Sequence, residues 1–226
     1  MKIRKLVKSR IGLFGGTFNP VHSGHLKAAS QVRERFFLGK VFFIPSYIPP
    51  HKESGEIASP EHRLKMVELA CAPYEKFIVS QIEIEARGTS YSVDTLRKFE
   101  RLYPDALVFF ILGIDAFLEI ETWKDYRELL ESCFFIVMSR PGYSLDEAGG
   151  VLGGSYREKI VEVAEPEQLE MLFSEYRVFL FEIDALDVSS SEIRQRVKQG
   201  LPIKGLVPES VEKYIKEHKV YHSENE

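Results

Sequence analysis

Short apolar runs alternate along the chain with longer segments in which apolar residues recur at helical spacing. The runs 107–112 and 133–138 are almost continuously apolar, which is typical of strands buried on both faces of a sheet. In 77–85, Ile82 and Ile84 alternate with glutamates, which indicates an extended segment. Further strands are predicted at 10–14, 41–44 and 178–183, and helices at 24–37, 60–72, 92–103, 190–199 and 208–217.

Strands that alternate with helices predict an α/β fold: a doubly wound, Rossmann-like parallel sheet with helices on both faces and further helices at the C-terminal end. We expect one domain over residues 1–226, with a leader at 1–9 and a C-terminal helical part at 190–220. Segment 143–174 is the least regular, and its glycines favour turns, with a lid as the alternative. Ligands of such sheets bind beyond the carboxyl ends of the strands.

Composition narrows the class of protein. The chain has 226 residues and a net charge of -4, with a pI of about 5.9, which argues against a nucleic-acid-binding protein. No apolar run approaches the roughly 18 residues of a membrane helix, and the basic start lacks the apolar stretch of a signal peptide. We therefore expect a cytoplasmic protein, with Cys71 and Cys133 as buried, reduced thiols.

The stretch GGTFNPVHSGHL follows the first predicted strand. Gly15 and Gly16 can turn tightly there and bring backbone amides close to an anion. Ser23 is the expected cap of the next helix, which would place His22 and His25 one turn apart at a helix N-terminus, where phosphate is favoured. The alternatives are surface histidines or a metal pair, but no carboxylate or cysteine nearby completes a ligand set. The residues alone indicate an anion site.

This stretch resembles the H-x-G-H signature of the nucleotidyltransferase superfamily, and its full length resembles the nicotinate-nucleotide adenylyltransferases. The stretch VSSSEIR resembles a second motif of that family, I-S-S-T-x-I-R, with Val188 for isoleucine and Ser191 for threonine. The chain departs from the family pattern in its leader and at Gly113-Ile114, where the pattern has two glycines. Further matches follow in order at 44–52, 87–91, 94–96, 113–115, 123–124, 139–142 and 206–208.

The resemblance implies that ATP and nicotinate mononucleotide react to give deamido-NAD and pyrophosphate in NAD biosynthesis. It implies no covalent enzyme intermediate, and Mg²⁺ that is bound through the ATP phosphates with no metal ligand from the protein. ATP and nicotinate mononucleotide are then the partners. We expect no nucleic acid and no membrane among them, and the sequence leaves a homo-oligomer open.

The resemblance also assigns residues to roles. The catalytic set is His22, His25 and Arg194. The residues expected to hold ATP and its phosphates are Gly15, Gly16, Thr17, Phe18, Lys52, Ser190 and Ser191. Those expected at the nicotinate ring and ribose are Asn19, Thr89, Tyr91, Asp115 and Trp123.

Each assignment has a structural alternative. Arg194 would otherwise be a surface arginine, Lys52 an exposed lysine, and Asp115 a helix cap. Tyr91 and Trp123 would otherwise pack against the core. Ser190 and Ser191 stand where a helix begins, and a cap that leaves amides open is compatible with an anion site.

Two other functions stay open at this point. One is a transferase for another phosphorylated acceptor, such as pantetheine phosphate or glycerol phosphate, whose enzymes usually carry F-D-P where this chain has Phe18-Asn19-Pro20. The other is a non-catalytic, nucleotide-binding regulatory module on the same fold. The intact His22, His25 and Arg194 argue against the module.

Overall fold

The computed structural model describes residues 9–50, 57–163 and 169–222, without the side chains of 169–171. These residues form a seven-stranded sheet in the order β3-β2-β1-β4-β5-β7-β6, and every adjacent pair is parallel. The sheet confirms the predicted α/β, doubly wound architecture. The strands are β1 Ser9–Gly16, β2 Lys40–Pro45, β3 Phe77–Val79, β4 Ala106–Gly113, β5 Phe134–Met138, β6 Ile160–Glu162 and β7 Val178–Phe181.

Helices cover both faces of the sheet, because the central strands are apolar on both sides. Helices α1 (Ser23–Arg35), α2 (Pro60–Cys71) and α8 (Leu169–Glu175) pack on one face. The other face carries α3 (Ile82–Ala86), α4 (Ser92–Leu102), α5 (Ile114–Phe117), α6 (Tyr126–Ser132) and α7 (Ala148–Val151). None of the helices in the described ranges is both long and apolar enough to cross a bilayer.

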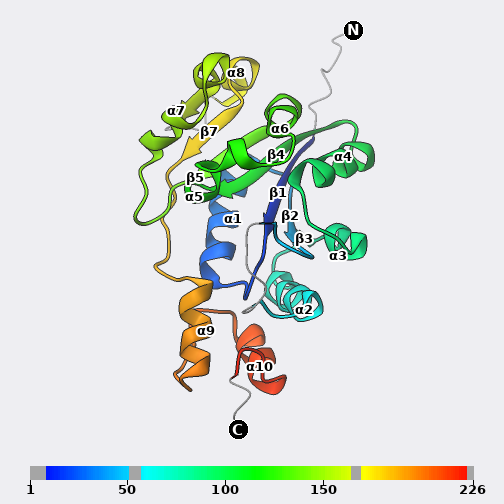
Figure 1. Cartoon of the computed structure of the whole chain (residues 1–226), viewed down its shortest axis with the longest axis vertical. Helices are drawn as coiled ribbons and strands as arrows, with labels where there is room; N and C mark the ends of the chain where they lie inside the picture. Colours follow the sequence, from blue (N-terminus) through cyan, green and yellow to red (C-terminus); the bar gives the residue numbers. More distant parts are fainter. Residues whose placement is uncertain (1–8, 51–56, 164–168, 223–226) are drawn as a thin grey trace.

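The last two helices, α9 (Ser190–Lys198) and α10 (Glu209–Glu217), lie together below α1 and α2 in Figure 1, coloured orange and red. They join the core on the α1 face: Ile193 and Val211 are fully buried in the same cluster as Val32 and Met66. The predicted C-terminal helical part therefore closes one end of the molecule.

Strand β1 lies between β2 and β4, at the point where the strand order reverses direction across the sheet. It pairs with β2 on one side and with β4 on the other, so Phe14 lies between Phe43 and Ile111. A crevice opens at the carboxyl ends of the strands at such a switch point. Gly12 leaves room for two side chains that pack over β1, because a Cβ there would lie 2.7 Å from the Ile111 side chain and 2.8 Å from that of Leu38.

Several sequence predictions of secondary structure are wrong. The extended segment 77–85 stops at Val79, and Ile82–Ala86 is the helix α3, which ends at Arg87 in the left-handed conformation. The predicted helix at 92–103 is α4, which begins at Ser92 with Tyr91 as its N-cap. Helices α5 and α6 were not predicted, and segment 143–174, described up to 163 and from 169, holds short helical turns at Leu145–Glu147 and Gly154–Lys159, α7, β6 and α8.

Candidate active site

The chain turns sharply after β1, at the carboxyl edge of the sheet. Gly15 and Gly16 still pair with β2, so the prediction that they form the turn is wrong. The turn follows at Phe18, whose φ of 47° is left-handed, and at a cis Asn19-Pro20 peptide. Gly16 is a tight position for a different reason: a Cβ there would lie 3.1 Å from the Phe18 ring, which folds back over the strand.

The two histidines stand at the start of α1, with their ring centroids 3.7 Å apart. His22 has extended backbone and is the N-cap of the helix, so the prediction of Ser23 as the cap is wrong. Two residues separate the histidines, and the second is glycine: a Cβ on Gly24 would lie 3.0 Å from the His22 ring and 2.9 Å from the Val188 side chain. The glycine of the motif therefore has a steric reason.

Hydrogen bonding defines the donor that His25 can offer. The backbone N–H of His22 donates to Nδ1 of His25 at 3.2 Å. A neutral imidazole that accepts at Nδ1 carries its proton on Nε2. The ring is held edge-on against Phe18, with 5.1 Å between the centroids. His25 in its neutral form therefore presents an Nε2–H donor from a fixed ring.

His22 is 8% exposed, and burial lowers its pKa to about 4, with the positive charge of Arg140 adding to the effect. The ring is therefore neutral at pH 7 in the free protein. Its Nδ1 is buried without a hydrogen-bond partner among the described residues. A buried polar atom of this kind is unfavourable unless a ligand satisfies it. An anion beside the ring would raise the pKa again, because it favours the charged form.

Helix α9 binds the corner after β1 through two side chains. The Ser190 hydroxyl donates to the Pro20 carbonyl at 2.9 Å, and the Arg194 guanidinium donates to the Asn19 carbonyl at 3.0 Å. The structure thus brings the second family motif to the first, as the resemblance implied, and Arg194 is not a free surface arginine.

The N-cap of α9 is Ser189, whose hydroxyl accepts from the Glu192 N–H at 3.1 Å. The prediction that Ser190 or Ser191 is the cap is therefore wrong. Ser190 instead turns toward the corner, and Ser191 is exposed. Three adjacent serines are chemically equivalent as caps, so the sequence alone did not distinguish them.

The Asn19 side chain is held from two sides. Its Oδ1 accepts from the Ala58 N–H at 3.0 Å and from the Tyr221 hydroxyl at 2.8 Å. Burial raises the pKa of Tyr221, so the hydroxyl stays a donor. Sequence reasoning missed Tyr221, because nothing near the end of the chain distinguishes it from a surface tyrosine.

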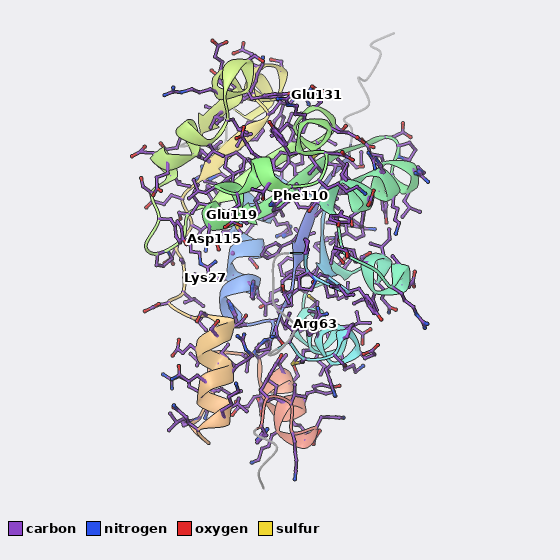
Figure 2. All side chains as sticks on the ribbon, in the orientation of Figure 1. Lys27, Arg63, Phe110, Asp115, Glu119 and Glu131 are labelled. Carbon is purple, nitrogen blue, oxygen red and sulfur yellow. The ribbon has the colours of Figure 1, made fainter. Side chains whose placement is uncertain are left out.

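Arg63 was also missed, although it is a fully buried side chain. It lies in the first turn of α2, between that helix and the carboxyl ends of β1 and β2 (Figure 2). Its guanidinium donates to the carbonyls of Thr17, Ser46, Tyr47 and Ala58. A signal did exist: the residue shares one helical face with the apolar residues three, four and seven positions further on, which are all buried.

The segment Thr89–Tyr91 lies next to the loop after β2. The Ser90 hydroxyl accepts from the Tyr47 N–H at 2.9 Å, and the Ser90 N–H donates to the Ile48 carbonyl at 2.9 Å. Tyr91 is 36% exposed, with the Lys124 ammonium 4.7 Å from its ring centroid. Thr89 and Tyr91, which are expected at the nicotinate ring and ribose, thus lie at the start of α4 with the Lys124 ammonium beside Tyr91.

Asp115 lies in the first turn of α5, at the carboxyl end of β4, and its carboxylate pairs with Arg140. Gly113 makes room for it, since a Cβ there would lie 2.5 Å from Asp115 Oδ1. Trp123 is half-buried and meets Phe110 edge-on at 6.3 Å, which fits the packing alternative for its inner edge. Lys52 lies outside the described residues.

Comparison with known proteins gives relatives over most of the chain. The cytidylyltransferase-like family model matches residues 13–196. A protein of Desulfatibacillum aliphaticivorans named "probable nicotinate-nucleotide adenylyltransferase" is 45% identical over 94% of this chain and 99% of its own. A protein of Moorella thermoacetica with the same name is 43% identical over 94% of this chain and 91% of its own.

Solved structures show the same fold. Plasmodium falciparum nicotinic acid mononucleotide adenylyltransferase complexed with NaAD superposes with a TM-score of 0.70 and 18% identity over 94% of this chain and 97% of that one. A putative nicotinate-nucleotide adenylyltransferase from Vibrio parahaemolyticus superposes with a TM-score of 0.63 and 16% identity, over 95% of this chain and 96% of that one.

The corner after β1 and the match over most of the chain define a nucleotidyltransferase of the cytidylyltransferase-like family, to which this chain belongs. Within that family it belongs with the nicotinate-nucleotide adenylyltransferases of NAD biosynthesis.

The neutral state of His22 predicts how stability depends on pH. The pKa is 6.5 when unfolded and about 4 when folded, so between these values the unfolded chain binds the proton and the folded chain does not. The free energy of unfolding should therefore fall by roughly 2–3 kcal/mol through this group between pH 7 and 4.5. Urea unfolding at both pH values should show a smaller fall for His22→Asn. A His22 ring that titrates near pH 6.5 by NMR would contradict the prediction.

Proposed function

We propose that the protein transfers the adenylyl group of ATP to the 5′-phosphate of nicotinate mononucleotide, giving deamido-NAD and pyrophosphate. The observation that carries this proposal is the convergence of His22, His25 and Arg194 on one corner at the carboxyl end of β1. Membership of the nicotinate-nucleotide adenylyltransferases supports the pair of substrates.

In this reaction an oxygen of the acceptor's 5′-phosphate attacks the α-phosphorus of ATP. A new P–O–P bridge forms, the bond between the α-phosphorus and the oxygen leading to the β-phosphate breaks, and pyrophosphate leaves with the electron pair. No protein nucleophile is needed and no covalent enzyme intermediate forms. The protein contributes by holding two anions in line and by stabilising the negative charge that spreads over the phosphate oxygens.

The histidines are donors to the reacting phosphates. His25 presents Nε2–H because its Nδ1 accepts from the His22 backbone. His22 is neutral before the substrates bind, and the incoming phosphates raise its pKa toward the charged form. Both rings are held in place by packing, so they need little reorganisation as charge develops.

Arg194 holds the β- and γ-phosphates with the part of its guanidinium that does not bind Asn19, since the planar fork offers paired donors. The Ser190 hydroxyl holds the corner after β1 against the start of α9, through its bond to the Pro20 carbonyl. The remaining contacts to ATP and its phosphates come from the corner, the start of α9 and the loop after β2. The residues are Gly15, Gly16, Thr17, Phe18, Lys52 and Ser191.

The acceptor binds at the residues that the resemblance assigns to the nicotinate ring and the ribose. The amides of Thr89 and Tyr91 receive the pyridine carboxylate, whereas that of Ser90 donates to the Ile48 carbonyl. Trp123 stacks on the ring with its exposed part. Asp115 accepts ribose hydroxyls once its pair with Arg140 opens. We also assign Asn19 here, where its side-chain amide is held by Tyr221. A site of N–H donors for an anion rejects the neutral amide, because that ligand leaves the donors unpaired.

Mg²⁺ enters with ATP in this proposal. In the described ranges no group of three or more histidine, cysteine or acidic side chains is arranged to hold a metal ion. Imidazole and guanidinium donors fit phosphate oxygens, whereas Mg²⁺ prefers oxygen ligands. The residues present thus fit the anions, and the ion is held by the phosphates of the substrate.

The proposed reaction is tested by pyrophosphate release with ATP and Mg²⁺, with the acid and the amide mononucleotide as separate acceptors. We expect turnover with nicotinate mononucleotide and a kcat/KM at least about 100-fold lower with the amide. Equal values for the two acceptors would contradict the role of Thr89–Tyr91. Release only with pantetheine phosphate or glycerol phosphate would identify another transferase, and ATP binding without release would identify a regulatory module.

The histidines can be tested against a histidine outside the site. His22→Ala and His25→Ala should each lower kcat by about 100-fold or more, because each removes a donor to the charge that develops. The matched control is His218→Ala, at the exposed end of α10, which should keep near-native kcat. Either site variant with near-native kcat and an intact fold would show that the histidine is not catalytic.

Arg194 has a matched control on its own helix. Arg194→Lys should lower kcat/KM for ATP by about 100-fold, because lysine lacks the planar fork that binds the Asn19 carbonyl and the phosphates together. Arg196→Lys should be nearly neutral, since Arg196 pairs with Glu192 at 2.8 Å away from the corner. Steady-state kinetics with ATP varied compares the two, and equal effects would refute the phosphate role of Arg194.

A further inference from the structure

Arg63 is the largest fully buried side chain in the described part of the protein. It makes four hydrogen bonds, to Thr17 O at 2.9 Å, Ser46 O at 2.6 Å, Tyr47 O at 2.9 Å and Ala58 O at 2.9 Å. All four acceptors are backbone carbonyls, and no carboxylate pairs with the guanidinium in the described residues. Burial lowers the pKa of Arg63, but an arginine stays charged in proteins.

The four carbonyls belong to three different segments. Thr17 lies in the corner after β1, Ser46 and Tyr47 lie in the loop after β2, and Ala58 lies just before α2. A guanidinium has five N–H donors in one rigid plane, so it can hold all three segments at fixed positions. A lysine has one flexible ammonium and cannot reproduce that plane.

The contacts continue from the loop after β2 to the segment that is proposed to bind the pyridine carboxylate. Tyr47, whose carbonyl binds Arg63, donates its N–H to the Ser90 hydroxyl at 2.9 Å. The Ser90 hydroxyl also interacts with the carboxylate of Glu83, which accepts from the Thr95 hydroxyl at 2.6 Å. Burial raises the pKa of Glu83, and these two hydroxyls oppose that shift.

One continuous path therefore runs from Thr17 in the phosphate corner through Arg63 and Tyr47 to Ser90. We propose that Arg63 is a positioning residue for the reaction: it holds the phosphate corner and the segment Thr89–Tyr91 in one arrangement, and the preference for an acid acceptor depends on it. This inference rests on the proposed function, because it assumes that Thr89–Tyr91 bind the acceptor's carboxylate.

Arg63 also stabilises the fold, because its loss would leave four carbonyls without this donor, and unpaired buried carbonyls are costly. Activity alone cannot separate positioning from stability. The ratio of kcat/KM for the acid mononucleotide to kcat/KM for the amide separates the two effects. A variant that is only less stable lowers both values together and leaves the ratio unchanged. The ratio changes only when the donors of Thr89–Tyr91 move relative to the phosphate corner.

The experiment compares Arg63→Lys with Val67→Ala, one turn further on the same buried face of α2. Val67 is fully buried in the apolar core, so its truncation leaves a cavity and destabilises the protein without changing the loop carbonyls. Both variants are assayed with ATP and each mononucleotide, well below their melting temperatures. We expect Arg63→Lys to lower the acid-to-amide ratio by about tenfold or more, which is a loss of at least about 1.4 kcal/mol in discrimination, and Val67→Ala to leave it unchanged.

Ser90→Ala is the second variant, and it decides the question if Arg63→Lys does not fold. It removes the acceptor of the Tyr47 N–H and should lower the same ratio. The double variant should lower the ratio no further than the larger of the two single effects, because both changes interrupt one path. Independent effects that multiply would overturn the proposal.

The outcomes distinguish a failure of the proposed function from a failure of the role of Arg63. A wild-type protein that uses neither mononucleotide contradicts the proposed function, and the positioning role with it. A wild-type protein that prefers the acid, together with an Arg63→Lys variant that keeps the full preference, overturns the role of Arg63 alone. A fall in the ratio for Arg63→Lys but not for Val67→Ala supports it.

Discussion

The rest of the site depends on the way in which the carbonyls of the corner after β1 are satisfied. Between Gly16 and Pro20 the chain is neither strand nor helix, yet it is mostly buried. Buried carbonyls need donors, and an unpaired one costs about 1–3 kcal/mol. Four carbonyls of this corner accept from groups outside it. The donors are the Ser46 N–H, the Arg63 and Arg194 guanidiniums and the Ser190 hydroxyl.

This constraint links the chemistry to the architecture. Helix α9 reaches the corner only after the chain has completed the sheet, and α2 reaches it from the crossover between β2 and β3. Each helix brings an arginine that serves as a donor to a carbonyl, so the groups that shape the corner also place positive charge around it. A protein with a net charge of -4 can thus bind two phosphorylated substrates, because the cations are local.

The protonation of the histidine pair also depends on the burial of this corner. Burial keeps His22 neutral in the free protein, and the backbone of His22 defines the tautomer of His25. His22 therefore begins as a neutral ring beside cations, and an anion that enters favours its charged form. Such an arrangement favours phosphate at His22, because among the described residues the charged group that affects its pKa is the cation Arg140. Arg140 itself pairs with Asp115 at the more exposed edge.

The sequence by itself determined the parts that depend on local pattern. Continuous apolar runs identified β4 and β5 as buried strands, and strand–helix alternation identified a parallel sheet, because period and burial are properties of neighbouring residues. The motif around His22 and His25 predicted an anion site for the same reason. Tertiary structure alone decided which serine caps α9, that 82–86 is a helix despite its alternating pattern, and that Arg63 and Tyr221 reach the corner. Glu83 illustrates the physical reason: its carboxylate meets hydroxyls of Ser90 and Thr95, and such contacts exist only once distant segments are packed together.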